Sequence, residues 1–120
     1  MNTINWFELP TLDLARATKF YEVVFERRLK QEAVGPIPMA IFEAKDPSIG
    51  GALIRDPARQ PSKDGTLVYL NTAGAMNACL GRAVKAGGEV VLPRTDIGPP
   101  GFIALIRDTE GNVVGLHEER

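Results

Sequence analysis

The stretch NWFELPTLDLARATKFYEVVF, residues 5 to 25, holds the features that decide the fold. Residues 5–9 favour a short strand, and a proline-containing connection then leads to Asp13, whose carboxylate can accept hydrogen bonds from the free amides of a following helix. Apolar residues recur after it at steps of three and four: Leu14, Ala17, Tyr21, Val24 and Phe25. This spacing predicts an amphipathic helix with one face packed on a sheet.

Two more strands are predicted in the first half, at residues 39–42 and 49–55, and we expect them to be antiparallel neighbours. A loop containing Gly35, Pro36 and Pro38 separates them from the helix. The polar, proline-bearing segment that follows has no hydrophobic period, so residues 57–65 are interpreted as a linker.

The same order of elements returns after the linker. Residues 66–71 favour a strand, and a helix ending at Gly87-Gly88 carries its apolar stripe on Met76, Cys79, Leu80, Ala83 and Val84. Strands are predicted at residues 90–93, 102–107 and 112–118, and the last two form a hairpin around residues 108–112.

We therefore interpret residues 1–56 and 66–120 as two β-α-β-β-β modules of one α+β domain spanning 1–120. Each predicted sheet is mixed and curved and has one face covered by a helix. The two free faces are expected to form a cup, which is a usual place for a small ligand.

Composition excludes several classes of function. Fourteen basic and fifteen acidic residues leave a formal charge of −1, so neither nucleic acid nor a membrane is expected as a partner. No secretory signal or membrane-spanning apolar run is present, which makes a cytoplasmic location the expectation. The lone cysteine, Cys79, is predicted to be a core residue. There is no phosphate-binding loop, nucleophile elbow or cysteine cluster.

Short phrases in both halves match a known family in order and spacing. They are WFELP (6–10), DLARA (13–17), FY (20–21), VYLN (68–71), AGG (86–88) and DTEGNVVGL (108–116). On these phrases the chain resembles the vicinal oxygen chelate superfamily, which includes glyoxalases, bleomycin resistance proteins and dioxygenases. The resemblance covers nearly the whole chain and implies the paired-module fold. It also implies a homodimer, sometimes with modules paired across subunits.

The resemblance further implies a divalent metal held by His and Glu side chains from the first and last strands of each module. The corresponding positions fall at or beside Trp6, Gly51, Leu67 and Gly115, whose side chains cannot ligate a metal. Glu8 and His117 are the only ligand types near them on the strands, and a catalytic zinc usually takes three protein ligands. We therefore expect neither a metal nor another cofactor.

Strand alternation places Trp6 and Glu8 on the cup face and the residues between and after them beneath the helix. By the same rule Tyr69 and Asn71 share a face, and His117 shares one with Gly115. Trp6 and Tyr69 offer flat apolar surfaces with a polar handle, which suit a planar ligand, or they simply fill the cup.

Charged residues give the candidates for catalysis and ligand binding. Glu8 can act as a general base or receive a ligand cation, although an ion pair with Arg55, Arg94 or Arg107 is an alternative. His117 is a candidate acid or base, but a lone histidine also commonly makes a structural hydrogen bond. Arg94 is a candidate ligand-binding residue because the loop after it, residues 95–101, can close over a cup.

Four candidate functions follow from these observations. The leading hypothesis is metal-independent binding of a small apolar or aromatic molecule. The first alternative is a metal-independent isomerase or lyase with Glu8 as base and His117 or Tyr69 as acid. The others are a divalent-metal-dependent glyoxalase or dioxygenase-type enzyme with non-standard ligands, and an interaction module whose cup is filled by protein.

Overall fold

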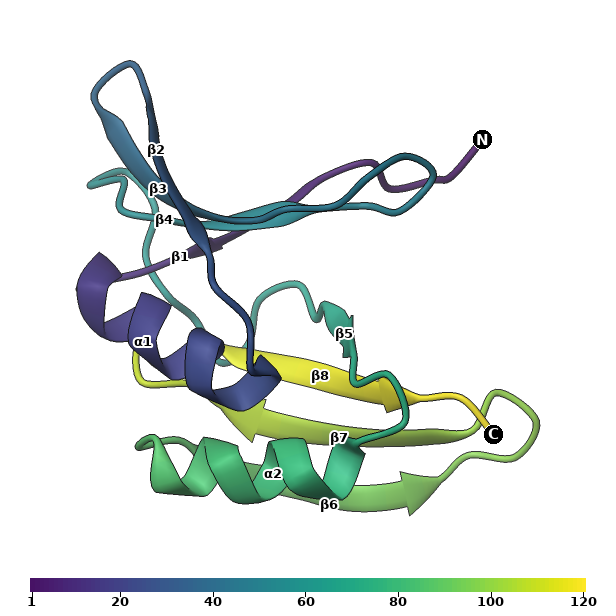
Figure 1. The fold of residues 1–120 in the computed structure, drawn as a ribbon. Helices are drawn as coiled ribbons and strands as arrows, with labels where there is room; N and C mark the ends of the chain where they lie inside the picture. Colours follow the sequence, from purple (N-terminus) through teal and green to yellow (C-terminus); the bar gives the residue numbers. More distant parts are fainter.

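The computed structural model describes all 120 residues as two four-stranded sheets and two helices (Figure 1). The elements are β1 (Phe7–Pro10), α1 (Leu14–Phe25), β2 (Lys30–Val34), β3 (Ile37–Phe42), β4 (Gly51–Ile54), β5 (Tyr69–Asn71), α2 (Met76–Lys85), β6 (Glu89–Asp96), β7 (Phe102–Arg107) and β8 (Val113–Glu118). Each half is a β-α-β-β-β unit, so the predicted α+β fold is confirmed. No helix is long and apolar enough to cross a membrane.

The two sheets have the same strand order. It is β1-β4-β3-β2 in the first sheet and β5-β8-β7-β6 in the second. β1 runs parallel to β4 and β5 runs parallel to β8, while the remaining pairs are antiparallel. Both sheets are therefore mixed, and the predicted antiparallel neighbours of the first half are β3 and β4.

Two local predictions are wrong. Strand β2 lies where only a loop was expected. It was not predicted because all five of its residues are exposed at the edge of the sheet and show no apolar alternation. Pro38 lies within β3, and only the turn between β2 and β3 is a loop. Val84 was assigned to the apolar stripe of α2 but is exposed, while Met76, Cys79 and Ala83 are buried as expected.

One hydrophobic core joins the two halves. Asp13 caps α1 as predicted, accepting a hydrogen bond of 3.0 Å from the amide of Arg16. The buried face of this helix belongs to a single cluster of 16 residues that includes Leu9 of the first sheet and Leu116 of the second. The helix-bearing sides of both sheets therefore share the same interior.

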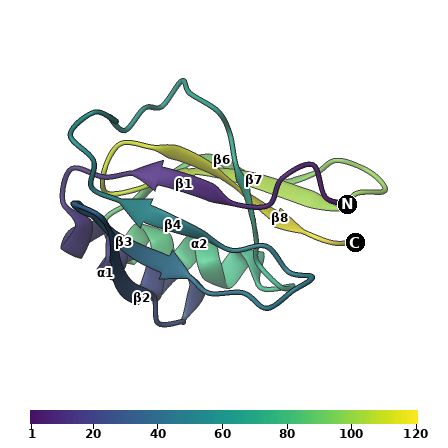
Figure 2. The same cartoon turned by 90° about the horizontal axis from the view of Figure 1, so that it is seen from above.

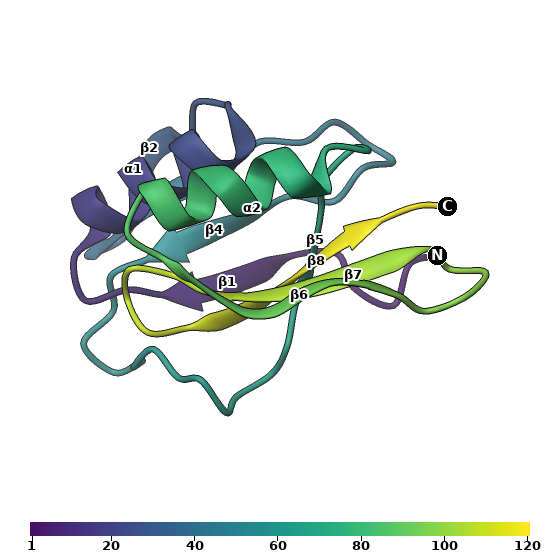
Figure 3. The ribbon, with the colours of Figure 1, turned by 90° about the horizontal axis from the view of Figure 1, so that it is seen from below.

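The two sheets meet at an angle with both helices inside it. Figure 1 shows α1 beneath the first sheet, on the side that faces the second sheet. Figure 2 shows the helices together under the first sheet, and Figure 3 shows α1 and α2 side by side, where they contact each other. The remaining side of each sheet, called its outer face below, carries no helix.

Candidate functional site

The outer face of the first sheet is mostly apolar. Strand register aligns Glu8 with Ala52 and then Ile41 across the sheet, and the next row aligns Pro10 with Ile54. A separate apolar cluster covers this face, made of Ile37, Met39, Ile41, Ala52 and Ile54. Glu8 thus lies on the edge strand beside an apolar surface.

Trp6 and Glu8 lie together at this edge. Trp6 is 42% exposed, and its Nε1 donates a hydrogen bond of 3.2 Å to a carboxylate oxygen of Glu8. Phe7 and Leu9 instead pack into the shared core, which is the alternation that the sequence predicts.

Glu8 forms no ion pair with an arginine. Two of the alternative partners are engaged elsewhere, since Arg94 pairs with Glu118 and Arg107 pairs with Glu89. A depression of about 420 Å³ lies beside Glu8, bordered by Ile54 and by residues 58–60 of the connecting segment. The Glu8 carboxylate is therefore open to solvent and to a small molecule.

Tyr69 is the main aromatic residue on the outer face of the second sheet. It is 46% exposed, and its ring covers Gly115, its partner across the parallel β5–β8 pair. A Cβ atom at Gly115 would overlap the Tyr69 ring, so glycine is what allows the ring to lie flat on the sheet.

Asn71 and His117 are neighbours on this second outer face, where their Cα atoms pair across β5 and β8. His117 Nε2 lies 2.7 Å from the carbonyl oxygen of Pro100; because a carbonyl only accepts, Nε2 carries the proton. The Asn71 side-chain oxygen accepts a hydrogen bond of 2.8 Å from the amide of Ala73. Both side chains hold the ends of loops.

Arg94 is also held by protein groups. Its Nε donates a hydrogen bond of 2.9 Å to Glu118, and this bond holds the pKa of the Glu118 carboxyl below its usual value. The centre of the guanidinium lies 3.6 Å from the centroid of the Phe102 ring, a cation–π contact. Arg94 is therefore held in place by Glu118 and Phe102.

The predicted site residues are therefore divided between two faces. Trp6 and Glu8 lie on the outer face of the first sheet, whereas Tyr69, Asn71 and His117 belong to the second sheet. Since both helices occupy the angle between the sheets, the outer faces point apart (Figures 1 and 2). Within one chain Glu8 and His117 do not form an acid–base pair.

The side chains at these positions do not fit the divalent metal that the resemblance implies. Gly51 faces Phe7 on the helix side of the first sheet, and its outer neighbour is Ala52, which has no donor atom. No three His, Cys, Asp or Glu side chains gather anywhere in the chain. The two nearby ligand types, Glu8 and His117, lie on different sheets.

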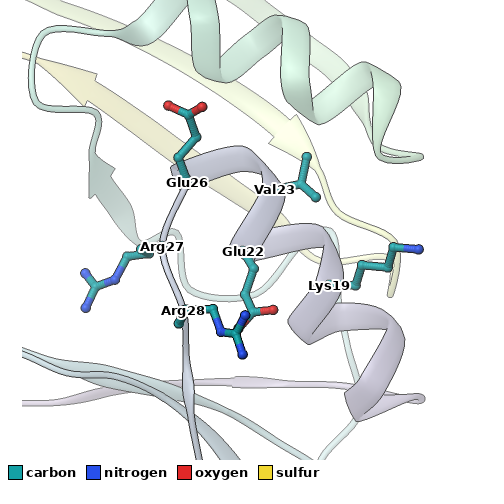
Figure 4. A pocket seen from close by; sticks show the side chains of 6 residues that line it. All are labelled: Lys19, Glu22, Val23, Glu26, Arg27 and Arg28. Atoms are coloured by element: carbon teal, nitrogen blue, oxygen red, sulfur yellow. The ribbon is translucent and has the colours of Figure 1, made fainter.

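Two further hollows lie outside the outer faces. The smaller, about 290 Å³, is a surface depression on the exposed side of α1 (Figure 4). Its lining side chains are charged apart from one, and they are Lys19, Glu22, Val23, Glu26, Arg27 and Arg28. Because only one of its lining side chains is apolar and it is a shallow surface depression, it is a poor site for a small organic ligand.

The larger cavity, about 440 Å³, lies between the two halves on the helix side of the sheets. Its walls include Phe7 of β1, Phe25 of α1 and Leu70 of β5, and Asn71 reaches its rim. Sequence reasoning missed this cavity because each apolar lining residue follows the ordinary period of a core residue in its own element.

Comparison with known proteins identifies relatives of the chain. The family model of the Glyoxalase/Bleomycin resistance protein/Dioxygenase superfamily matches residues 3–116. The Mycobacterium tuberculosis protein CFP32, named as a candidate glyoxylase, is 30% identical over 119 residues, which are 95% of this chain and 44% of that protein. A glyoxylase-like domain-containing protein from Didymella fabae is 30% identical over 114 residues, 91% of this chain and 88% of the relative. The chain spans less than half the length of CFP32.

Solved structures share the fold at low identity. A glyoxalase I variant from Zea mays has a TM-score of 0.72 and 20% identity, covering 94% of this chain and 44% of the other. An antibiotic binding protein from Streptomyces sp. CB03234 has a TM-score of 0.70 and 21% identity, covering 100% of this chain and 98% of the other.

Proposed function

Because the chain belongs to the glyoxalase/bleomycin resistance protein/dioxygenase superfamily, we propose that it binds a small apolar or aromatic molecule without a metal ion. The observation that carries this proposal is the exposure of Trp6 and Tyr69 on sheet faces that no helix covers. Flat rings with a polar handle suit a planar ligand. The antibiotic binding protein from Streptomyces, which has a similar fold, supports a binding role.

The proposed site is completed in a homodimer, with the first sheet of one protomer facing the second sheet of its partner. This pairing would bring Trp6 of one copy opposite Tyr69 of the other and form the cup that neither chain forms alone. The apolar cluster around Met39 and Ile54 supports it, because a solvated sheet face normally alternates to polar residues. A cytoplasmic location belongs to the same proposal.

Intrinsic fluorescence tests the binding role, because Trp6 is the only tryptophan of the chain. We expect the neutral planar probes phenazine and 1-naphthol to quench Trp6 emission, and Tyr69→Ala to weaken their binding about tenfold, as loss of an aromatic contact usually does. Val84→Ala, which shortens an exposed apolar side chain on α2, is the matched control. Absence of quenching by both probes, or equal losses in the two variants, would contradict the proposal.

Light scattering tests the dimer. The wild-type protein should have twice the mass of the chain, and Ile41→Glu, which places a charge in the apolar outer face, should shift it to monomer and weaken probe binding. A wild-type monomer at high concentration that still binds both probes would refute the shared cup.

A metal-independent isomerase or lyase is the second candidate, because the Glu8 carboxylate forms no ion pair with an arginine and borders a depression open to small molecules. Such an enzyme needs its base within about 3 Å of the proton that it removes. It predicts that a ligand co-purified with the protein exchanges a carbon-bound hydrogen with D2O and that Glu8→Gln abolishes the exchange. Ligand binding without any hydrogen exchange would contradict the enzyme and support binding as the only function.

A further inference from the structure

The cavity of about 440 Å³ lies between the two halves on the helix side of the sheets, and among the predicted outer-face residues only Asn71 borders it. Residues of both halves line it, with Phe7, Phe25 and Phe42 from the first half and Leu70 and Cys79 from the second. Protein interiors leave few voids larger than a water molecule, whereas small-molecule sites commonly have this volume. The volume of the cavity lies in the range of small-molecule sites.

Aromatic rings form one wall of this cavity. The centroids of Phe7 and Phe42 lie 5.7 Å apart with the rings tilted, and Phe25 closes the wall from the end of α1. Ile49, from the connection between β3 and β4, adds an aliphatic side chain to the lining. Such a wall favours a flat apolar body over a flexible polar one.

The rim of the cavity carries one excess positive charge, since Arg27 and Arg82 line it with a single acid, Glu26. Arg82 approaches Glu26 at 3.5 Å and donates a hydrogen bond to the carbonyl of Val24. Arg27 forms no ion pair; it donates to a backbone carbonyl, that of Glu43, at 2.6 Å. Figure 4 shows the Arg27 side chain, just after the end of α1, pointing away from Glu22 and Glu26.

An arginine without an acidic partner beside an aromatic wall is suited to a carboxylate. We propose that this cavity binds a small monoanionic molecule with a flat apolar body, of the aryl carboxylate class. The body lies against Phe7, Phe25 and Phe42, and the anionic group meets Arg27. This site is on the helix side of the sheets, so it is independent of the outer-face site under Proposed function.

Matched probes test the charge and the place together. 2-Naphthoate and its neutral analogue 2-naphthamide share a flat body, and their binding is followed by amide NMR shifts of the full chain. We expect 2-naphthoate to bind at least about tenfold more tightly, since removing a charged hydrogen-bond partner has about that effect. The largest shifts should fall at residues 25–27, 70–75 and 79.

Three variants locate the site. Arg27→Gln should abolish the preference for 2-naphthoate, and Ala75→Phe, at a surface position that lines the cavity, should block binding of both probes. Ala78→Phe, on an exposed position of α2 outside the cavity, is the control and should change nothing. Tyr69→Ala should also leave 2-naphthoate binding unchanged.

Several results would overturn the inference. The first is that 2-naphthoate does not bind, and the second is that the two probes bind equally. The third is that the largest NMR shifts fall at Trp6 and Tyr69 and that Tyr69→Ala loses binding. The last result would support the outer-face function while removing this site. Conversely, if Tyr69→Ala still binds 2-naphthoate, the cavity site is supported even when phenazine and 1-naphthol do not bind to the outer faces.

Discussion

Replacing Glu110 by Gln should destabilise the protein, because this side chain joins the two halves. The Glu110 side chain is fully buried in the turn between β7 and β8 and accepts hydrogen bonds of 2.9 and 2.8 Å from the amides of Leu12 and Asp13. Its other oxygen accepts from Arg16 Nε at 2.8 Å and from the Thr109 hydroxyl at 2.9 Å. A carboxylate of the second half thus binds the start of α1 in the first.

The magnitude follows from the pKa of Glu110. Burial by itself raises this pKa, but the hydrogen bonds from Arg16, Asp13, Thr109 and Leu12 outweigh burial and lower it from 4.5 to about 2. A lowering of that size corresponds to about 3 kcal/mol of stability. The contribution is fully present above pH 4.5 and is lost as the pH falls toward 2, because the unfolded chain binds the proton more readily.

Urea unfolding measures this contribution. Glu110→Gln keeps the shape but presents an amide donor to Arg16, so we expect a loss of about 3 kcal/mol at pH 7 that shrinks steadily below pH 4.5. Glu119→Gln, at an exposed position near the C-terminus, is the control and should stay within about 0.5 kcal/mol of wild type. A Glu110→Gln loss that is the same at pH 7 and pH 3 would refute the assignment of the energy to the carboxylate charge.

Two further predictions concern packing. Gly51→Ala should lower the free energy of unfolding in urea by about 1–3 kcal/mol, and by more than Gly115→Ala does. The reason is that the Phe7 ring over Gly51 packs against the core, whereas the Tyr69 ring over Gly115 can swing into solvent. Equal losses in the two variants would contradict this difference. Cys79 is 2% exposed, and burial raises the pKa of its thiol. We therefore expect a thiol reagent to label Cys79 only as fast as the protein opens. Prompt labelling of the folded protein would contradict this expectation.

Local sequence patterns predicted most of the helices and strands. Asp13 caps α1 and Cys79 is buried in α2, as expected, because caps and apolar periods depend on residues only three or four positions apart. The exposed edge strand β2 was not predicted, because none of its positions is buried and its sequence shows no apolar alternation. The ion pair considered for Glu8 does not form, and Arg94 and Arg107 pair instead with Glu118 and Glu89.

The candidate site was predictable residue by residue but not as an arrangement. Alternation placed Glu8 on the same face as Trp6, and the structure joins these two side chains, whereas the pairing of Asn71 with His117 across β5 and β8 comes from the structure alone. Nothing in the alternation specifies on which side of the molecule each sheet turns its helix-free face. That depends on how α1 and α2 contact each other inside the angle between the sheets.

The sequence by itself determined both helices and the strands other than β2, since their hydrophobic periods and turns are local properties of the chain. Only the tertiary structure decided how the two halves meet, because the contacts responsible join residues about a hundred positions apart, as between Leu12 and Glu110. A turn motif in the sequence gives no sign that its carboxylate will bind a distant helix. The division of the predicted site between two outer faces, and the cavity between the halves, follow from that long-range packing.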